Sequence, residues 1–366
     1  MRRTPVLIVG GGPAGSAAAI TLARGGITPE LIERTSQPRE VVCGGFLGWD
    51  ALARLERLGI DVGRLGARPI HRLRVVAGRR SAEADLPRPA AGLSRKTLGA
   101  ALLDAAADAG TTVLRGVSVR TADPHSRSLR LDSGDEVVCD ALFLATGKHE
   151  LRGLARPLAG RSEEPAAGLR TALPPSAVLH RALTGFIELH LFDQGYAGLL
   201  LQEDGTANLC LSISRQRLVA AGSARGLLAE VLQEAPLLAR LVGHSLPTQW
   251  TAVAGVPYGW RACTTSDGLF RIGDQSAVIA SLAGDGIAIA LTSGMTAAAA
   301  MLSGGAAAAP DWQGSFADRS RLPLGLADVL RRAGERRTSR AALMSLMQVA
   351  PALATRAARW TRIDPR

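Results

Sequence analysis

A glycine-rich turn near the start of the chain restricts its fold more than any other feature. The apolar run at residues 5–9 (PVLIV) is followed by GGGPAG at residues 10–15 and then by an alanine-rich segment. Gly10, Gly12 and Gly15 match the pattern G-x-G-x-x-G. In that pattern the first glycine allows a tight turn, the second lets backbone approach a pyrophosphate, and the third lets helix and strand pack closely. The pattern predicts a strand, a turn and a helix to about Arg24, whose first N–H groups face phosphates.

A second predicted strand at residues 28–32 ends at Glu33, about twenty residues after the turn. An acid at this position can bind a ribose diol. An ordinary strand–helix–strand unit with a glycine-rich turn is the alternative, but here the motif has its strand, its helix, its second strand and its acid. We therefore predict a dinucleotide site and leave NAD and FAD open. NADP is disfavoured because Glu33 would repel a 2′-phosphate, although Arg34 sits beside it.

Composition excludes several other classes of protein. The 366 residues, 47% of them hydrophobic, can bury a large core and suggest two or three lobes. The net charge is +11, and nearly all of the positive charge is carried by arginine, since Lys96 and Lys148 are the only lysines. These arginines are scattered and aromatic residues are 4%, so no nucleic-acid partner is expected. The four cysteines are widely spaced without a C-x-x-C pair, so neither a disulfide scaffold nor a metal site is expected.

The chain also shows no targeting segment. Its N-terminus runs directly into the first strand without a signal peptide, and the apolar stretch at 277–302 is interrupted by Asp285 and glycines. A cytoplasmic location is expected.

The later parts of the chain add a second set of cofactor-binding features. A helix is predicted at 98–109, and strands are predicted at 112–119, 129–138 and 140–145. A strand at 268–272 ends in Gly273-Asp274, and residues 283–286 (AGDG) lead into a helix that continues to about Met301. A second acid at a strand end and a second glycine-rich helix start exceed what a plain NAD dehydrogenase needs.

Over about residues 5–302 the chain resembles the FAD-dependent oxidoreductases of the aromatic-hydroxylase fold. This superfamily contains the group A flavin monooxygenases and the geranylgeranyl reductases. The resemblance implies an α/β protein with a Rossmann-like FAD-binding domain, an antiparallel β-sheet substrate domain and C-terminal helices. The expected boundaries are 1–67, 94–165 and 264–305 for the FAD-binding domain, 68–93 and 166–263 for the substrate domain, and 306–366 for the C-terminal helical segment.

The resemblance also implies which residues bind FAD. The glycine turn would hold the pyrophosphate, Glu33 the adenosine ribose, Arg95 the nucleotide, Val119 the adenine through its backbone, and Asp274 the ribityl chain. The loop at 284–286 would lie beside the pyrimidine edge of the flavin, where a helix N-terminus stabilises negative charge. A surface ion pair for Arg95 and a helix cap for Asp274 are the structural alternatives. The full predicted set is Gly10, Gly12, Pro13, Ala14, Gly15, Glu33, Arg34, Arg95, Val119, Gly273, Asp274, Gly284, Asp285, Gly286 and Ile287.

Three departures from the hydroxylases bear on the reaction. Thr146 stands where hydroxylases carry the aspartate of an Asp-Gly motif, and Lys148 and His149 follow it as possible sources of positive charge. The loop after Asp274 lacks the usual His and Pro. The segment at 42–45 (VCGG) resembles the Cys-Gly-Gly segment of geranylgeranyl reductases, in which the cysteine faces the substrate. Cys43 is therefore a candidate catalytic residue that donates a proton or shapes the pocket, with a packed apolar cysteine as the alternative.

The middle of the chain is predicted to form the substrate lobe. Segments 186–192, 196–201 and 207–213 alternate apolar and polar residues between turns, which is typical of an antiparallel meander. The candidate pocket residues are Phe46, His190, Tyr196, Tyr258 and Trp260. The plainer interpretation of such residues is half-buried sheet positions, because alternation alone explains them.

The C-terminal part is predicted to be helical at 322–334 and 341–360 and to carry a concentration of arginine. We expect these helices to cover the body of the protein. Contact with a membrane surface or a carrier protein is the alternative.

The resemblance favours a monooxygenase with NAD(P)H as reductant. Its substrate would be bulky and hydrophobic, such as an aromatic polyketide or an isoprenoid of specialised metabolism. A reductase of carbon–carbon double bonds, similar to geranylgeranyl reductases, is the alternative within the superfamily. A non-catalytic FAD-binding protein or a membrane-surface protein is the alternative from another class.

Overall fold

The apolar run that precedes the glycine turn forms the central strand of a mostly parallel sheet. In the computed structural model, which describes residues 2–124, 126–157, 165–243 and 246–363, β1 (Arg2–Val9) pairs in parallel with β2 and β9. The order of the sheet is β6-β2-β1-β9-β8-β7, with β15 on β9, and only the β7–β8 and β8–β9 pairs are antiparallel. The other strands of this sheet are β2 (Glu30–Glu33), β6 (Thr112–Arg115), β7 (Val119–Asp123), β8 (Ser128–Leu131), β9 (Glu136–Leu144) and β15 (Leu269–Arg271).

Both faces of this sheet are covered, which explains why β1 is apolar without alternation. Val6 and Ile8 join the core made with α1 (Pro13–Arg24), α3 (Arg95–Asp108) and α8 (Gly286–Gly304). Leu7 and Val9 pack on the opposite side in a core that includes residues of β7, β8 and β9.

Helix α8 is long and apolar enough to cross a membrane by length and composition. In this structure it packs against α1 so closely that a Cβ on Gly294 would lie 2.2 Å from the carbonyl oxygen of Ala14. The apolar composition of α8 is therefore explained by its place in the core.

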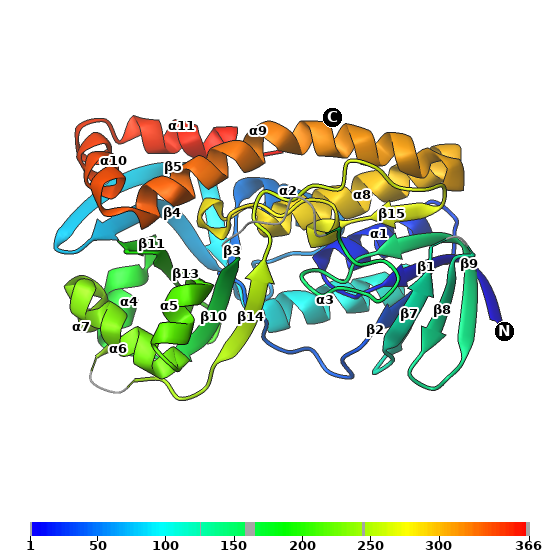
Figure 1. Cartoon of the computed structure of the whole chain (residues 1–366), viewed down its shortest axis with the longest axis horizontal. Coiled ribbons are helices and arrows are strands. Elements are labelled where there is room, and N and C mark those ends of the chain that lie inside the picture. The colour runs from blue at the N-terminus through cyan, green and yellow to red at the C-terminus, as the bar shows by residue number, and fades with distance from the viewer. Residues whose placement is uncertain (1, 125, 158–164, 244–245, 364–366) are drawn as a thin grey trace.

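The second sheet has the order β14-β10-β13-β12-β11-β4-β5-β3. The predicted meander is present as β11, β12 and β13, and the pairs are antiparallel except that β4 and β11 are parallel. Helices α4 to α7 close one face of the sheet (Figure 1). The strands are β3 (Phe46–Leu47), β4 (Arg68–Ala77), β5 (Arg80–Gly92), β10 (Ala166–Leu173), β11 (Gly185–Phe192), β12 (Gly195–Leu201), β13 (Ala207–Ser214) and β14 (Thr251–Val256). The helices of this half are α4 (Ala177–Leu183), α5 (Arg215–Ala220), α6 (Ala224–Glu234) and α7 (Pro236–Val242), with α2 (Trp49–Arg57) between the two halves of the chain.

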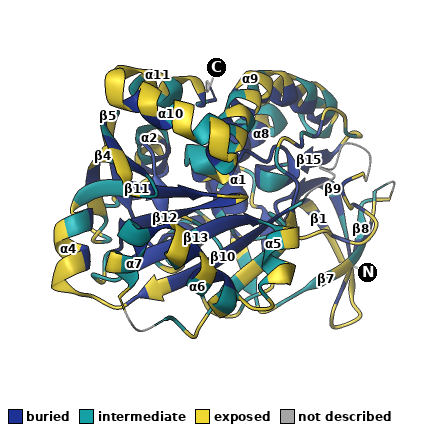
Figure 2. Ribbon diagram, turned by 60° about the vertical axis from the view of Figure 1, so that its left-hand side comes forward, coloured by how far each residue is buried: buried dark blue, intermediate teal, exposed yellow. Residues whose placement is uncertain are grey.

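The C-terminal helices connect the two halves. Helix α9 (Ala309–Glu335) runs past β15 and α8 and then past β11 and β12, and α10 (Arg337–Val349) and α11 (Ala352–Trp360) pack on β4 and β5 (Figure 1). The predicted helices are present, but the first begins at Ala309 rather than at residue 322. Strands β10 to β13 of the second sheet are largely buried, whereas α9 to α11 present exposed strips to solvent (Figure 2).

Two predicted strands are wrong. The strand predicted at 112–119 ends at Arg115 as β6, and β7 begins only at Val119. Residues 129–138 form two strands, because a tight turn at Ser133-Gly134 separates β8 from β9. Gly134 has φ +91°, a conformation that glycine adopts without strain. Residues 132–136 (DSGDE) interrupt the apolar alternation and include a Ser-Gly pair, so the sequence does carry a turn signal here that the prediction missed.

The predicted division into domains stays a prediction. Residues 158–164, next to the predicted boundary at 165/166, and residues 364–366 of the predicted C-terminal segment lie outside the described residues.

Candidate active site

A cavity of about 790 Å³ lies between the two sheets. Its volume is within the range of ligand-binding pockets. One wall comes from the glycine turn, the end of β2 and the start of α3, and the other from β10 to β13 together with the segment at 41–46. All of the predicted cofactor residues except Gly15 and Asp285, and three of the predicted substrate residues, therefore line one cavity.

The glycine turn has the geometry that its sequence pattern predicts. Gly10 has φ +108°, and a Cβ there would lie 2.4 Å from the carbonyl oxygen of Ala145. A Cβ on Gly15 would lie 1.9 Å from the carbonyl oxygen of Gly10, so this glycine is needed for packing and does not line the cavity. A Cβ on Gly12 would meet no protein atom within 4 Å. The free space above Gly12, at the uncapped N-terminus of α1, suits an anionic group.

Glu33 lies beside this turn at the end of β2. Its Oε2 accepts a hydrogen bond from the Gly11 amide at 2.8 Å, and its Oε1 accepts from the amide of Thr35 at 2.9 Å and from the Thr35 hydroxyl at 2.7 Å. A carboxylate has about four lone pairs, so acceptor capacity remains for a ribose diol. Glu33 thus both holds the turn and lines the cavity.

Two basic side chains on the cavity wall are engaged with each other. Arg34 Nη2 lies 2.6 Å from His149 Nε2, and both residues line the cavity. The pKa of His149 is lowered by its burial and then by the positive charges of four neighbours, which are Arg34, Arg39, Lys148 and Arg156. The imidazole is therefore neutral near pH 7 and can accept the hydrogen bond from Arg34.

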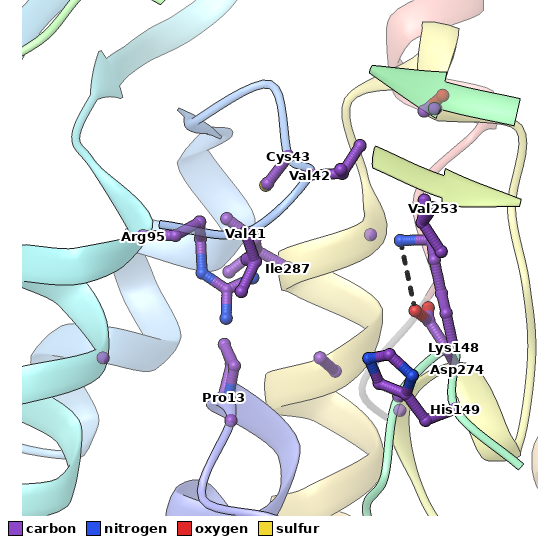
Figure 3. A pocket seen from close by; sticks show the side chains of 18 of the residues that line it. Pro13, Val41, Val42, Cys43, Arg95, Lys148, His149, Val253, Asp274 and Ile287 are labelled. Atoms are coloured by element: carbon purple, nitrogen blue, oxygen red, sulfur yellow. Dashed lines mark ion pairs between the residues drawn. The ribbon is translucent and has the colours of Figure 1, made fainter. Parts of the chain in front are cut away.

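Arg95, at the first turn of α3, is aimed at the glycine turn and its side chain points toward Pro13 (Figure 3). Its buried Nε has no hydrogen-bond partner among the described residues. A buried donor without a partner costs free energy, so this position calls for an acceptor such as a cofactor phosphate. Val119, at the start of β7, also lines the cavity.

The second glycine-rich motif also lines the cavity, and a Cβ on Gly273 would lie 3.0 Å from Ala14 Cβ of the glycine turn. Gly273, Asp274, Gly284, Gly286 and Ile287 line the cavity, and Gly273 donates its amide proton to the Ser293 hydroxyl at 2.8 Å. Lys148 Nζ lies 3.4 Å from Asp274 Oδ2 (Figure 3), and this carboxylate raises the pKa of Lys148. The N-terminus of α8 opens here, where it favours negative charge on a bound group.

The structure does not bring Asp285 into the cavity wall. Its side chain is 1% exposed and forms an ion pair with Arg362, which also lies 3.0 Å from Asp50 Oδ1 and stacks on Trp49. The prediction that Asp285 contacts the cofactor is therefore wrong for its side chain, which instead forms a structural ion pair at the start of α8. Sequence could not reveal this pair, because Arg362 lies far along the chain.

Cys43 does line the cavity, in a loop held against the second sheet (Figure 3). Asn208 on β13 donates hydrogen bonds to the carbonyl oxygens of Cys43 and Gly44 at 2.9 and 2.8 Å. Arg170 on β10 donates in turn to Asn208 Oδ1 at 2.8 Å. A Cβ on Gly168 would lie 2.7 Å from Val42 Cγ1, so the loop rests directly on β10. Sequence reasoning missed Arg170 and Asn208, which carry no motif.

At the substrate end, Phe46, Tyr196 and Tyr258 line the cavity as predicted. Two serines that the sequence did not single out, Ser212 and Ser281, line it with them. The remaining surface here is mainly aliphatic.

His190 and Trp260 do not line the cavity, and these two predictions need correction. His190 is fully buried, with Nε2 2.7 Å from Glu188 Oε1, and Glu188 is paired with Arg74 at 2.7 Å. Burial opposes ionisation of Glu188, but the hydrogen bonds from His190 and Arg74 lower its pKa. Trp260 is 8% exposed and lies under the guanidinium of Arg156. Both residues are structural, as the alternation of sheet residues alone would suggest.

The residues present fit FAD. Four features that suit FAD line one cavity. They are the space above Gly12, the Arg95 Nε that has no partner among the described residues, the carboxylate of Glu33 and the N-terminus of α8. No cluster of three or more His, Cys, Asp or Glu side chains that could hold a metal is found among the described residues.

Comparison with known proteins supports this assignment. Residues 3–144 match the family of FAD binding domains. The chain is 32% identical over 160 residues to menaquinone reductase of Mycolicibacterium smegmatis, a match that covers 41% of this chain and 39% of that protein. It is 34% identical over 130 residues to the chloroplastic geranylgeranyl diphosphate reductase of Nicotiana tabacum, covering 34% of this chain and 27% of that one. The match thus spans about two fifths of the length of the mycobacterial relative and about a quarter of the length of the plant relative.

Solved structures match over nearly the whole chain. The flavin-dependent brominase Bmp2 has a TM-score of 0.75 at 17% identity, covering 99% of this chain and 94% of that one. A geranylgeranyl bacteriochlorophyll reductase-like protein from Thermoplasma acidophilum has a TM-score of 0.74 at 18% identity, covering 97% and 98%. Residues 3–144 therefore match an FAD binding domain, as predicted, and the chain as a whole shares its fold with the flavin-dependent brominase and the reductase-like protein.

Proposed function

We propose that this oxidoreductase reduces a carbon–carbon double bond in a bulky apolar substrate such as an isoprenoid chain. The observation that carries the proposal is the position of Cys43, whose loop lines the cavity between the FAD-binding turn and the substrate sheet. This segment is where the sequence resembles geranylgeranyl reductases. The names of the two curated relatives, both reductases, support the same reaction class.

FAD bound in this cavity would supply the electron pair for the reduction. The chain itself would contribute the aliphatic wall that holds the substrate and a thiol that can deliver a proton. Cys43 is a free cysteine, and the bonds from Asn208 fix its loop. NAD(P)H is the proposed reductant.

A monooxygenase that hydroxylates an aromatic polyketide or isoprenoid of specialised metabolism is the second candidate. Its support is the similarity of nearly the whole fold to a flavin-dependent brominase. Oxygen separates the two functions. Product formation with NADH or NADPH and a prenylated quinone should persist under anaerobic conditions for a reductase and stop for a monooxygenase.

The Cys43→Ala variant tests the proton-donor role. We expect it to retain FAD and to lose at least about tenfold in the rate of double-bond reduction, as is typical when a proton donor is removed. An unchanged rate in Cys43→Ala would contradict the role assigned to the thiol.

We further propose that the protein works at the cytoplasmic face of an anionic membrane. Residues 336–363 contain six arginines and no acidic residue. Exposed apolar side chains (Leu346, Val349, Leu353 and Trp360) lie on α10 and α11 beside exposed Arg356 and Arg359. Such a surface is complementary to anionic lipid headgroups. Vesicles of phosphatidylglycerol and phosphatidylcholine should sediment the protein better than phosphatidylcholine alone, and Arg356→Ala with Arg359→Ala should weaken the difference. Equal binding to both vesicles would contradict the proposal.

A further inference from the structure

The only two tyrosines of the chain converge on one serine in the cavity. Tyr196 on β12 and Tyr258, after β14, both have their hydroxyl groups in hydrogen-bond contact with Ser281 Oγ, the second at 2.6 Å. Ser212 Oγ on β13 lies 3.1 Å from Tyr258 Oη. These four residues, which we call the hydroxyl cluster, all line the cavity.

The hydroxyl cluster has one more donor than it uses. Four hydroxyl groups carry four protons, and three hydrogen bonds connect them in the order Tyr196, Ser281, Tyr258, Ser212. Each bond uses one proton, so one O–H group is left without an acceptor in the described part of the chain. Burial raises the pKa of Tyr196 well above its usual value, so this phenol stays protonated.

The apolar lining of the cavity makes it costly to leave the remaining O–H group without an acceptor. Leu199, Val256, Val278 and Leu282 line the cavity around it. Ser281 is the exposed member of the cluster and faces this space, whereas Ser212 and Tyr196 are buried. An apolar substrate that filled the cavity would remove water from the free O–H group, and an unsatisfied donor costs free energy.

We propose that the hydroxyl cluster donates a hydrogen bond to an oxygen acceptor of the substrate, such as a quinone or ketone carbonyl. The substrate class is then an apolar molecule with a carbonyl oxygen near its reacting part rather than a plain hydrocarbon chain. This inference rests on the proposed function and specifies its substrate. The cluster and Cys43 line the same cavity.

The test compares two ligands on the FAD-loaded protein. One is 2-methyl-3-prenyl-1,4-naphthoquinone and the other is 2-methyl-3-prenylnaphthalene, which lacks both oxygens. Affinity is measured from the quenching of protein and flavin fluorescence, without turnover. We expect the quinone to bind at least about tenfold more tightly, the effect of one hydrogen bond formed away from water.

Removal of the two hydroxyl groups of the cluster that are not buried should remove the preference. In Ser281→Ala combined with Tyr258→Phe, only the buried Tyr196 and Ser212 hydroxyls remain, and the two ligands should bind within about twofold of each other. Ser303→Ala is the matched control, because its exposed hydroxyl bonds only the carbonyl of Ala300 in its own helix at 3.1 Å. This control should keep the wild-type preference.

Two outcomes would overturn the inference. The first is a wild-type protein that does not bind the quinone or does not prefer it, and the second is a double variant that keeps the full preference. Either result leaves the anaerobic reduction assay independent, since that assay scores double-bond reduction and not the affinity ratio. Loss of anaerobic reduction with an intact preference would instead reject the reductase and keep the carbonyl-binding cluster.

Discussion

The two walls of the cavity are built in different ways. The FAD wall is made largely of backbone from one short stretch, residues 10–15, in which each motif glycine has its own steric reason. The substrate wall is made of side chains from segments far apart in sequence, including Tyr196, Ser212 and Tyr258, with Asn208 holding the Cys43 loop. A backbone requirement restricts residue type at fixed spacing and is visible in one sequence. A side-chain arrangement of this second kind becomes visible only when the strands are placed next to one another.

The largest expected effect is at the packing glycine of the FAD wall. Gly15→Val would place side-chain atoms against the carbonyl of Gly10, where even a Cβ has only 1.9 Å. We expect a loss of more than about 4 kcal/mol in the free energy of unfolding, and therefore little soluble protein. Thermal unfolding followed by circular dichroism measures it. Gly325→Ala, on the exposed side of α9 with no neighbour within 4 Å, is the control and should melt near the wild type. A Gly15→Val protein as stable as the control would break the comparison.

The second effect separates cofactor binding from folding. A valine at Gly12 meets no protein atom near its Cβ, so Gly12→Val should fold normally. It would occupy the space that we assign to the pyrophosphate and should weaken FAD binding by about 100-fold, equal to about 2.7 kcal/mol. Flavin absorbance after gel filtration, with titration of the apoprotein, measures this. Wild-type retention of flavin would contradict the assignment of the phosphate site.

A smaller effect is expected on the substrate wall. Asn208→Ala removes the donor to the carbonyls of Cys43 and Gly44 and leaves the Arg170 Nε without its acceptor. We expect a loss of about 1–3 kcal/mol in urea unfolding, with FAD still bound. Thr206→Ala, in the exposed turn before β13, is a control with a smaller expected loss. If Asn208→Ala released FAD as readily as Gly12→Val, the two walls would not be separable.

The smallest effect is a pH dependence at His149. Burial and the neighbouring arginines lower its pKa in the folded protein, so the unfolded chain binds a proton more readily. His149 therefore lowers the free energy of unfolding as the pH drops below about 6.5, the ordinary pKa of histidine. Above that pH its titration does not affect the stability. His149→Gln should therefore show a shallower loss of stability between pH 7 and pH 5 in urea unfolding. Identical slopes of stability against pH in the wild type and in His149→Gln would contradict this prediction.

Much of the fold could be predicted because local patterns determined it. The strand–turn–helix at residues 5–24, the meander and the helix after residue 286 follow from apolar periodicity and glycine spacing. The hairpin turn at Ser133 was missed although residues 132–136 carry a turn signal, and the early start of α9 was missed because Gly314 and Pro323 lower the helix propensity of its first half.

The candidate site was predicted less evenly. Most of the predicted cofactor residues line the cavity, whereas Arg170, Asn208, Ser212 and Ser281 were not predicted, because each acts through a contact with a distant segment. His190 was misplaced for a different reason. Its partner, Glu188, lies only two residues earlier on the same strand, but the burial of this pair and the contact of Glu188 with Arg74 are visible only in the fold.

The chain crosses between the two sheets several times, and this limits how such a protein can diversify in evolution. Strands β3 to β5 of the second sheet lie between β2 and α3 of the first, and the chain returns to the first sheet through β15 only after β14. Neither half is one continuous segment of the gene that an exchange of fragments could replace. New substrate preferences in this lineage must therefore arise by point substitutions in the cavity lining, while the glycine turn that holds the cofactor stays fixed.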